Sequence, residues 1–154
     1  MLSNMPKSVF NGLAALTVAI PVVAWSTLAP VHNVRASVTT LWESIPGDWI
    51  EHTATASNAT FSWQQGTLHG FGNMQMKTKT DTFEFKLVRL SATYADDLYG
   101  EWDVTRNGVP TCAGCKGHVW ISSMASDSYF KGSVERPDGL SYSFTGPLTS
   151  RTGY

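Results

Sequence analysis

From about residue 41 to the end of the chain, apolar and polar residues alternate in short runs that are separated by turn-forming residues. Successive side chains of a β-strand point to opposite faces, so this alternation is typical of strands with one buried and one solvated face. The runs at 82–90 and 140–146 show it most clearly. Further runs lie at 49–56, 60–64, 67–77, 98–105, 117–124 and 129–136. The sequence therefore predicts an all-β domain of about eight antiparallel strands in a small barrel or sandwich.

Two dipeptides predict tight hairpin turns in this domain. Asn107-Gly108 and Asp138-Gly139 both tolerate the positive φ angles that short hairpin loops require. Strands joined by such turns pair with each other, so we expect consecutive strands to be neighbours in the sheet.

The start of the first predicted strand carries a resemblance. Pro46-Gly47-Asp48-Trp49 resembles the Gly-x-Trp opening of the lipocalin and avidin group of up-and-down β-barrels, the calycins. The resemblance covers this opening and the number of strands. It implies a barrel in which Trp49 closes one end.

The N-terminal part of the chain has a different character. All 12 acidic residues lie at or beyond Glu43, and the stretch 9–29 contains no charged residue. A helix of about 20 apolar residues spans the hydrocarbon core of a bilayer, and Lys7 favours a cytoplasmic N-terminus. The predicted order is a cytoplasmic tip at 1–8, a transmembrane helix at 9–29, a linker at 30–40 and a periplasmic or extracellular β domain at 41–154.

The same apolar segment also fits a secretory signal. Val34-Arg35-Ala36 is a tripeptide that a signal peptidase could cut before Ser37. In this alternative the helix is removed and the β domain is secreted.

One face of the predicted helix is formed by small residues. Gly12, Ala15 and Ala19 are spaced three and four apart, so they share a face and permit close approach of a second helix in lipid. Trp25 lies near the far end of the helix, where an indole ring suits the membrane interface. We therefore expect this helix to dock against other membrane subunits and lipid.

The two cysteines lie close together in Cys112-Ala113-Gly114-Cys115, within the longest predicted loop. Haem attachment would need His directly after the second cysteine, where Lys116 stands, and a zinc site would need a fourth ligand beside Cys112, Cys115 and His118. A thioredoxin-like pair would need a following helix. We predict a disulfide that tightens an exposed loop in an oxidising compartment.

No pattern of catalytic, metal-binding or phosphate-binding residues is evident. Asp96-Asp97 are adjacent, so on a strand they point to opposite faces and cannot act as a pair. We predict no enzyme activity, no cofactor and no metal. A net charge of −1 without a basic stripe argues against nucleic acid as a partner.

Tryptophans are the other candidates for contacts, because indole rings serve as core residues, as cavity linings and as anchors of interfaces. The candidates for partner or ligand contact are Trp25, Trp42, Trp63, Trp102 and Trp120. Packing in the core is the alternative for those in strands.

These features together favour a non-catalytic accessory subunit of a membrane protein complex, such as a photosynthetic reaction centre or a respiratory assembly in electron transport. The alternative function is a periplasmic or secreted binding module of calycin type that takes a small apolar ligand in its barrel. A third hypothesis is a thiol-redox protein that uses Cys112 and Cys115.

Overall fold

A computed structural model describes residues 30–64, 69–94, 97–122 and 129–153. These residues form ten strands: β1 (Val31–Ala36), β2 (Thr40–Ile45), β3 (Asp48–Thr53), β4 (Ala56–Gln64), β5 (His69–Lys77), β6 (Thr82–Tyr94), β7 (Asp97–Arg106), β8 (Val109–Ile121), β9 (Tyr129–Glu135) and β10 (Ser141–Thr152). The part of the chain that the structure describes contains no helix able to cross a membrane. The predicted transmembrane helix at 9–29, with Gly12, Ala15, Ala19 and Trp25, lies outside the described residues.

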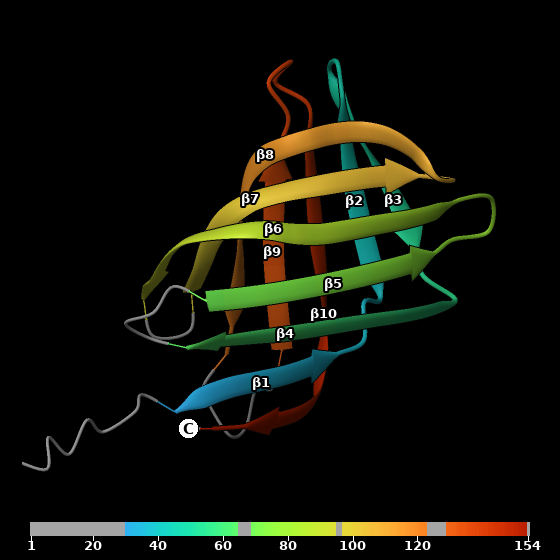
Figure 1. The fold of residues 1–154 in the computed structure, drawn as a ribbon. Helices are drawn as coiled ribbons and strands as arrows, with labels where there is room; N and C mark the ends of the chain where they lie inside the picture. Colours follow the sequence, from blue (N-terminus) through green and yellow to red (C-terminus); the bar gives the residue numbers. More distant parts are fainter. Residues whose placement is uncertain (1–29, 65–68, 95–96, 123–128, 154) are drawn as a thin grey trace, which may run out of the picture.

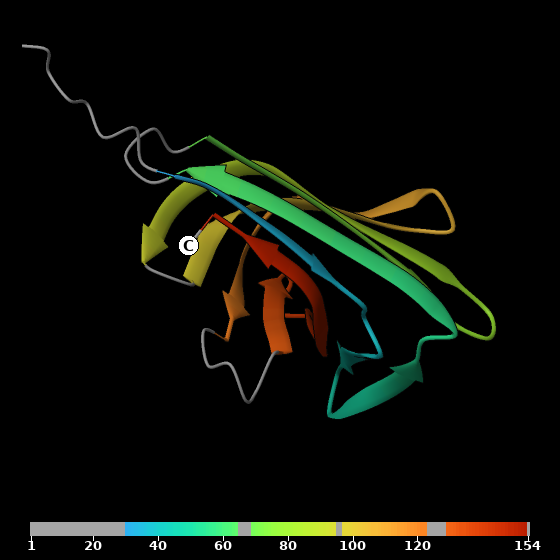
Figure 2. The ribbon, with the colours of Figure 1, turned by 90° about the horizontal axis from the view of Figure 1, so that it is seen from below.

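Eight of the strands close into an antiparallel barrel in the order β1-β4-β5-β6-β7-β8-β9-β10, and β10 pairs back onto β1. The all-β class, the antiparallel pairing and the barrel are thus confirmed. Figure 1 shows β4 to β8 crossing the view and β9, β10, β2 and β3 running almost at right angles to them. Figure 2, seen from below, shows that these groups form two layers. The barrel is therefore flattened, with its core between crossed layers.

The hairpin β2–β3 continues the sheet beyond the closed barrel. β10 pairs with β1 near its C-terminal end and with β2 near its N-terminal end. Between these pairings, the Ser37 and Thr39 amides each donate a 3.0 Å hydrogen bond to β10, to the carbonyls of Pro147 and Thr145. β1 and β2 therefore both pair with β10, one after the other along its length. β3 pairs with the other edge of β2.

Large aromatic rings fill the space between the layers. Phe85 contacts Tyr142 and Phe144, with ring centroids 5.5 Å apart in both pairs. The residues with the largest buried side chains include Phe61, Trp63, Phe83, Trp102 and Phe130. Each such ring contributes roughly 1.5–3 kcal/mol by leaving water.

Both predicted turns join antiparallel neighbours, but only Asn107-Gly108 forms a two-residue hairpin loop, because the connection with Asp138-Gly139 runs from Glu135 to Ser141. Asn107 and Gly108 both have positive φ, 53° and 78°, as a two-residue hairpin loop requires, and Gly139 has φ 82°. They connect β7 to β8 and β9 to β10.

The beginning of the domain differs from the prediction. Residues 30–40 were expected to form a linker, but they contain β1, which closes the barrel by pairing with both β4 and β10. The predicted strand at 49–56 corresponds to β3, which lies outside the closed ring of strands. The alternation in this region predicted a strand correctly, but it carries no information on which distant segment pairs with it.

Trp49 does not close the end of the barrel. It follows the turn at Gly47, where φ is 88°, and its side chain is 52% exposed on β3. The hairpin extends beyond the barrel, so an outward residue near its tip has no second layer to pack against. The role of Trp49 implied by the calycin resemblance is therefore wrong.

Candidate ligand-binding groove

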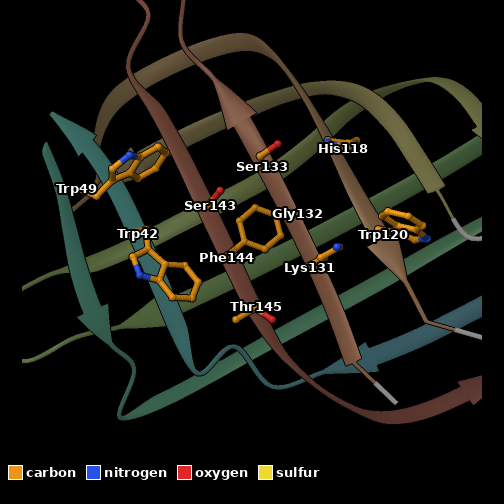
Figure 3. A pocket seen from close by; sticks show the side chains of 10 residues that line it. All are labelled: Trp42, Trp49, His118, Trp120, Lys131, Gly132, Ser133, Ser143, Phe144 and Thr145. Carbon is orange, nitrogen blue, oxygen red and sulfur yellow. The ribbon is translucent and has the colours of Figure 1, made fainter. Parts of the chain in front are cut away.

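A groove of about 680 Å³ lies on the outer face of the barrel, above β8, β9, β10 and the hairpin β2–β3. Figure 3 shows its two sides, with Trp42 and Trp49 on the hairpin and His118 and Trp120 on β8. The residues that line it are Trp42, Trp49, His118, Trp120, Lys131, Gly132, Ser133, Ser143, Phe144 and Thr145. We call this surface the aromatic groove.

The strand register places four groove residues in one row. Trp42 on β2 is paired with Ser143 on β10, Ser143 with Ser133 on β9, and Ser133 with His118 on β8. Paired residues of adjacent strands point to the same face, so the row follows the outer face from strand to strand. Their neighbours in sequence, such as Leu41 and Phe144, are buried in the core. The alternation along each strand therefore directs the four side chains of the row to the outer face.

The floor of the groove is polar and small. In the part of the chain that the structure describes, the hydroxyls of Ser133 and Ser143 have no hydrogen-bond partner, whereas the Thr145 hydroxyl donates to the Phe130 carbonyl at 3.1 Å. A serine hydroxyl offers one donor and two acceptor positions. The floor can therefore exchange hydrogen bonds with a ligand that carries hydroxyl groups.

The sides of the groove are indole rings. Trp49 and Trp120 are 52% and 50% exposed, and Trp42 is half-buried. The Lys131 ammonium lies over the Trp120 ring, 4.7 Å from its centroid, which is a cation–π contact. Exposed tryptophans on both sides of a polar floor offer flat apolar surfaces at the rim.

Two side chains beside the groove contact carboxylates. His118 Nδ1 is 3.2 Å from a carboxylate oxygen of Asp97, and the Lys116 ammonium donates to Glu101 at 2.8 Å. The hydrogen bond from Lys116, together with its charge, lowers the pKa of Glu101 below its usual value. The Lys116–Glu101 pair thus adds little net charge beside the groove.

A charged cluster holds the hairpin β2–β3 against the barrel. Arg106 on β7 donates to Asp81 at 2.8 Å and lies 3.4 Å from Glu43 on β2, and Glu43 also contacts His52 on β3 at 3.2 Å. The hydrogen bond from Arg106 is the main reason why the pKa of Asp81 is held far below its usual value, and it raises the pKa of Arg106. The Arg106 guanidinium also lies 5.1 Å from the centroid of the Phe83 ring. Since Trp42 and Trp49 are on this hairpin, the cluster fixes one side of the aromatic groove.

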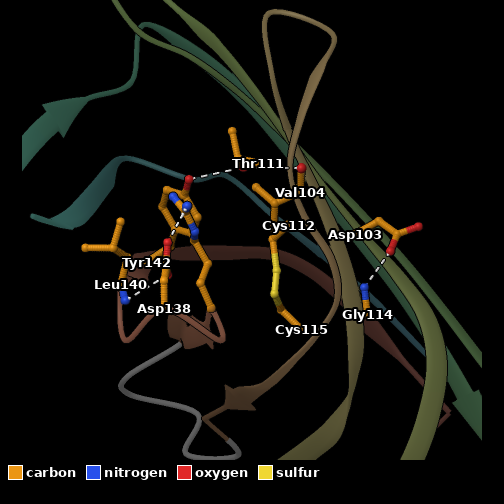
Figure 4. Close-up of a disulfide and its surroundings, with 10 residues drawn as sticks. Asp103, Val104, Thr111, Cys112, Gly114, Cys115, Asp138, Leu140 and Tyr142 are labelled. Atoms are coloured by element: carbon orange, nitrogen blue, oxygen red, sulfur yellow. Dashed lines mark hydrogen bonds and ion pairs between the residues drawn. A yellow bond between two sulfur atoms is a disulfide. The ribbon is translucent and has the colours of Figure 1, made fainter.

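The predicted cysteine pair is at disulfide distance, and Figure 4 shows the bond. The motif is not in a loop, however. It forms a bulge inside β8, where Trp102 is paired with Cys115 and Val104 with Cys112, and Gly114 takes φ 64°. The Gly114 amide donates to Asp103 at 2.9 Å. Cys112 and Cys115 are only 7% and 2% exposed, so the bond faces the core and does not contact the groove.

The structure separates the predicted contact tryptophans into two groups. Trp42 and Trp120 line the aromatic groove, whereas Trp63 and Trp102 are buried in the core. Sequence reasoning missed Ser133 and Ser143. The alternation in 129–136 and 140–146, joined by the predicted turn at Gly139, contained a signal that both serines point outward and face each other.

No group of three or more potential metal ligands is found among the residues that the structure describes. Comparisons of the chain with protein-family models, with curated proteins and with solved structures found no match.

Proposed function

We propose that the β domain is a non-catalytic module that binds a saccharide in the aromatic groove. One observation carries the proposal, namely the exposed indole rings on both sides of a floor with two serine hydroxyls that have no hydrogen-bond partner among the described residues. A sugar ring has an apolar face of C–H groups and a rim of hydroxyls. The C–H face fits the electron-rich face of an indole, and the rim fits the serine hydroxyls and His118.

A small apolar ligand inside the barrel has less support. The interior positions are occupied by rings that touch one another, including Phe61, Phe85 and Phe144. A cavity for a ligand would require several of these rings to move, at the cost of their packing.

A protein partner on the groove is the other reading of exposed tryptophans. Serine is depleted at protein interfaces, and covering the Ser133 and Ser143 hydroxyls with an apolar surface would cost about 1–3 kcal/mol for each hydroxyl left without a partner. A ligand rich in hydroxyls avoids this cost.

The proposal is tested by titration of the purified protein with soluble oligosaccharides of several sugar types. Tryptophan fluorescence and calorimetry measure the binding. Trp120→Ala is expected to weaken binding about tenfold or more, which corresponds to ~1.4 kcal/mol for the loss of one stacking surface. Phe71→Ala is the matched control, since Phe71 is an aromatic residue that is 57% exposed on β5, outside the groove. Absence of binding to every sugar, or equal binding by the Trp120 variant, would contradict the proposal.

The role as an accessory subunit of a membrane complex depends on residues 9–29 and stays a prediction. It is compatible with a binding module, because a domain tethered to a membrane can still present its outer face to a ligand.

A further inference from the structure

We infer that the groove takes an internal stretch of a neutral polysaccharide chain, which lies across β2, β10, β9, β8 and β7 and reaches a second subsite at Tyr99. This inference rests on the proposed saccharide binding and names the class of saccharide. Its basis is a second hollow that continues the groove along the outer face of the barrel.

A second hollow of about 210 Å³ adjoins the aromatic groove and is lined by Tyr99, Lys116, Gly117, His118, Ser133 and Glu135. It shares His118 and Ser133 with the first. Tyr99 on β7 is paired with His118, so it extends the row of Trp42, Ser143, Ser133 and His118 by one strand. Its side chain is 41% exposed. The extended row therefore has an aromatic ring at each end and hydroxyl and imidazole groups between them.

The length of this row suits a chain of sugars. It crosses five adjacent strands, and at ~4.8 Å between strands the path along the sheet from Trp42 to Tyr99 is about 19 Å. Several pyranose rings in a line cover such a distance, whereas a single ring covers only part of it. The row runs along the outer face of the sheet and not into the barrel, so a chain can enter at one end and leave at the other.

The charges along the row favour a neutral chain. His118 and Lys116 are each paired with a carboxylate, from Asp97 and Glu101, and Glu135 lines the second hollow. Lys131 is the cation of the first hollow, and it lies against the Trp120 ring. The Lys116–Glu101 pair is close to neutral, and the charge of Glu135 offsets that of Lys131, so the row offers an acidic chain no net attraction that a neutral chain lacks.

The experiment measures the affinity of the full chain for neutral oligosaccharides of increasing length, from a single ring to a hexamer, in the sugar series that binds best. Affinity is expected to rise about tenfold or more between the dimer and the tetramer and then to level off. Tyr99→Ala should lower the affinity for the tetramer and leave that for the dimer unchanged. Unchanged dimer binding also shows that the variant is folded, and Phe71→Ala serves as the control for a lost exposed ring.

The outcomes separate the inference from the proposed function. If the dimer binds as tightly as the hexamer, or if the Tyr99 variant binds the tetramer as well as the native chain, the extended subsite does not exist although saccharide binding stands. Tighter binding of an acidic oligomer, such as oligogalacturonate, than of any neutral one would overturn the neutral class. If no saccharide of any length binds, or if only a protein is retained on the groove, the proposed function itself fails.

Discussion

At the scale of single residues, the tryptophans show how one residue type serves two purposes in this molecule. Trp102 is fully buried and meets the ring of Phe61, with centroids 6.1 Å apart. Trp120 lies on the adjacent strand β8 between the buried residues Val119 and Ile121, so its ring points outward. The period of the strand, not the hydrophobicity of the side chain, decides which of them packs in the core.

Replacement of the two kinds of tryptophan should therefore affect stability differently. Trp102→Ala is expected to lower the free energy of unfolding by about 3–5 kcal/mol, as loss of a buried aromatic ring does. Trp49→Ala should cost less than about 1 kcal/mol, because the ring is largely exposed. Urea denaturation of both variants measures the difference, and a large loss for Trp49 would show that this ring packs in the core.

At the scale of elements, the hairpin β2–β3 is held to the barrel by a charged cluster in addition to the core packing of Leu41. Asp81 precedes β6 and Arg106 ends β7, and the pair contacts Glu43 on β2. Arg106 is also the residue whose guanidinium covers Phe83. The cluster therefore links β2 of the hairpin to β7 and to the residue before β6.

The low pKa of Asp81 implies a dependence of stability on pH. A carboxyl whose pKa is lower in the folded state than in the unfolded state stabilises the fold above its unfolded pKa, and this contribution is lost as the pH falls towards the folded pKa. Asp81→Asn is expected to lower Tm at pH 7. The difference in Tm from the native chain should shrink progressively below about pH 4.

Thermal unfolding at several pH values checks this prediction. Glu51→Gln is the matched control, because Glu51 is an exposed acid on β3 without an ion pair among the described residues. A Tm difference between Asp81→Asn and the native chain that stays constant from pH 7 to about pH 2 would show that the charge of Asp81 is not the cause.

The disulfide is a local feature of β8, since it closes a loop of two intervening residues. The entropy lost by the unfolded chain for such a short loop corresponds to about 2 kcal/mol. The double variant Cys112→Ala, Cys115→Ala is therefore expected to be less stable by roughly that amount and to bind saccharide as the native chain does. Loss of binding at unchanged stability would mean that the bulge shapes the groove after all.

At the scale of the whole molecule, β1 has a consequence for processing of the chain. Val34 and Ala36 are buried in the core, and β1 supplies the strand between β4 and β10. A cut before Ser37, the position considered for a signal peptidase, would remove β1 and leave two unpaired strand edges, which promote aggregation. Cleavage of an N-terminal segment that leaves this barrel intact therefore occurs before Val31.

Two truncated chains test this point. A chain that starts at Pro30 is expected to give a cooperative thermal transition and to stay monomeric, because it keeps all ten strands. A chain that starts at Ser37 should unfold at a lower temperature or aggregate. The N-terminal mass of the protein from its native source adds an independent check, and a mature chain that begins at Ser37 would contradict the role of β1 in closure.

The predicted docking of the helix at 9–29 also belongs to this scale. Gly12→Leu or Ala15→Leu would place a bulky side chain on the small-residue face, so the protein is expected to separate from its membrane partners in mild detergent while the β domain stays folded. Ala14→Leu is a matched control, since in the predicted helix residue 14 falls on a different face from Gly12 and Ala15. Unchanged co-purification of both test variants would argue against a docking helix.

The sequence by itself determined the all-β class, the hairpin turns at Gly108 and Gly139 and the pairing of the two cysteines. These features depend on contacts between residues that are close in the chain: alternation within a strand, φ angles within a turn and two cysteines three positions apart. Only the tertiary structure decided that β1 closes the barrel, that Trp49 is exposed and that Trp42, Ser143, Ser133 and His118 form one row. Those facts depend on pairings such as Asn33 with Thr152. Alternation states that a side chain faces one side or the other, but not which distant strand lies beside it.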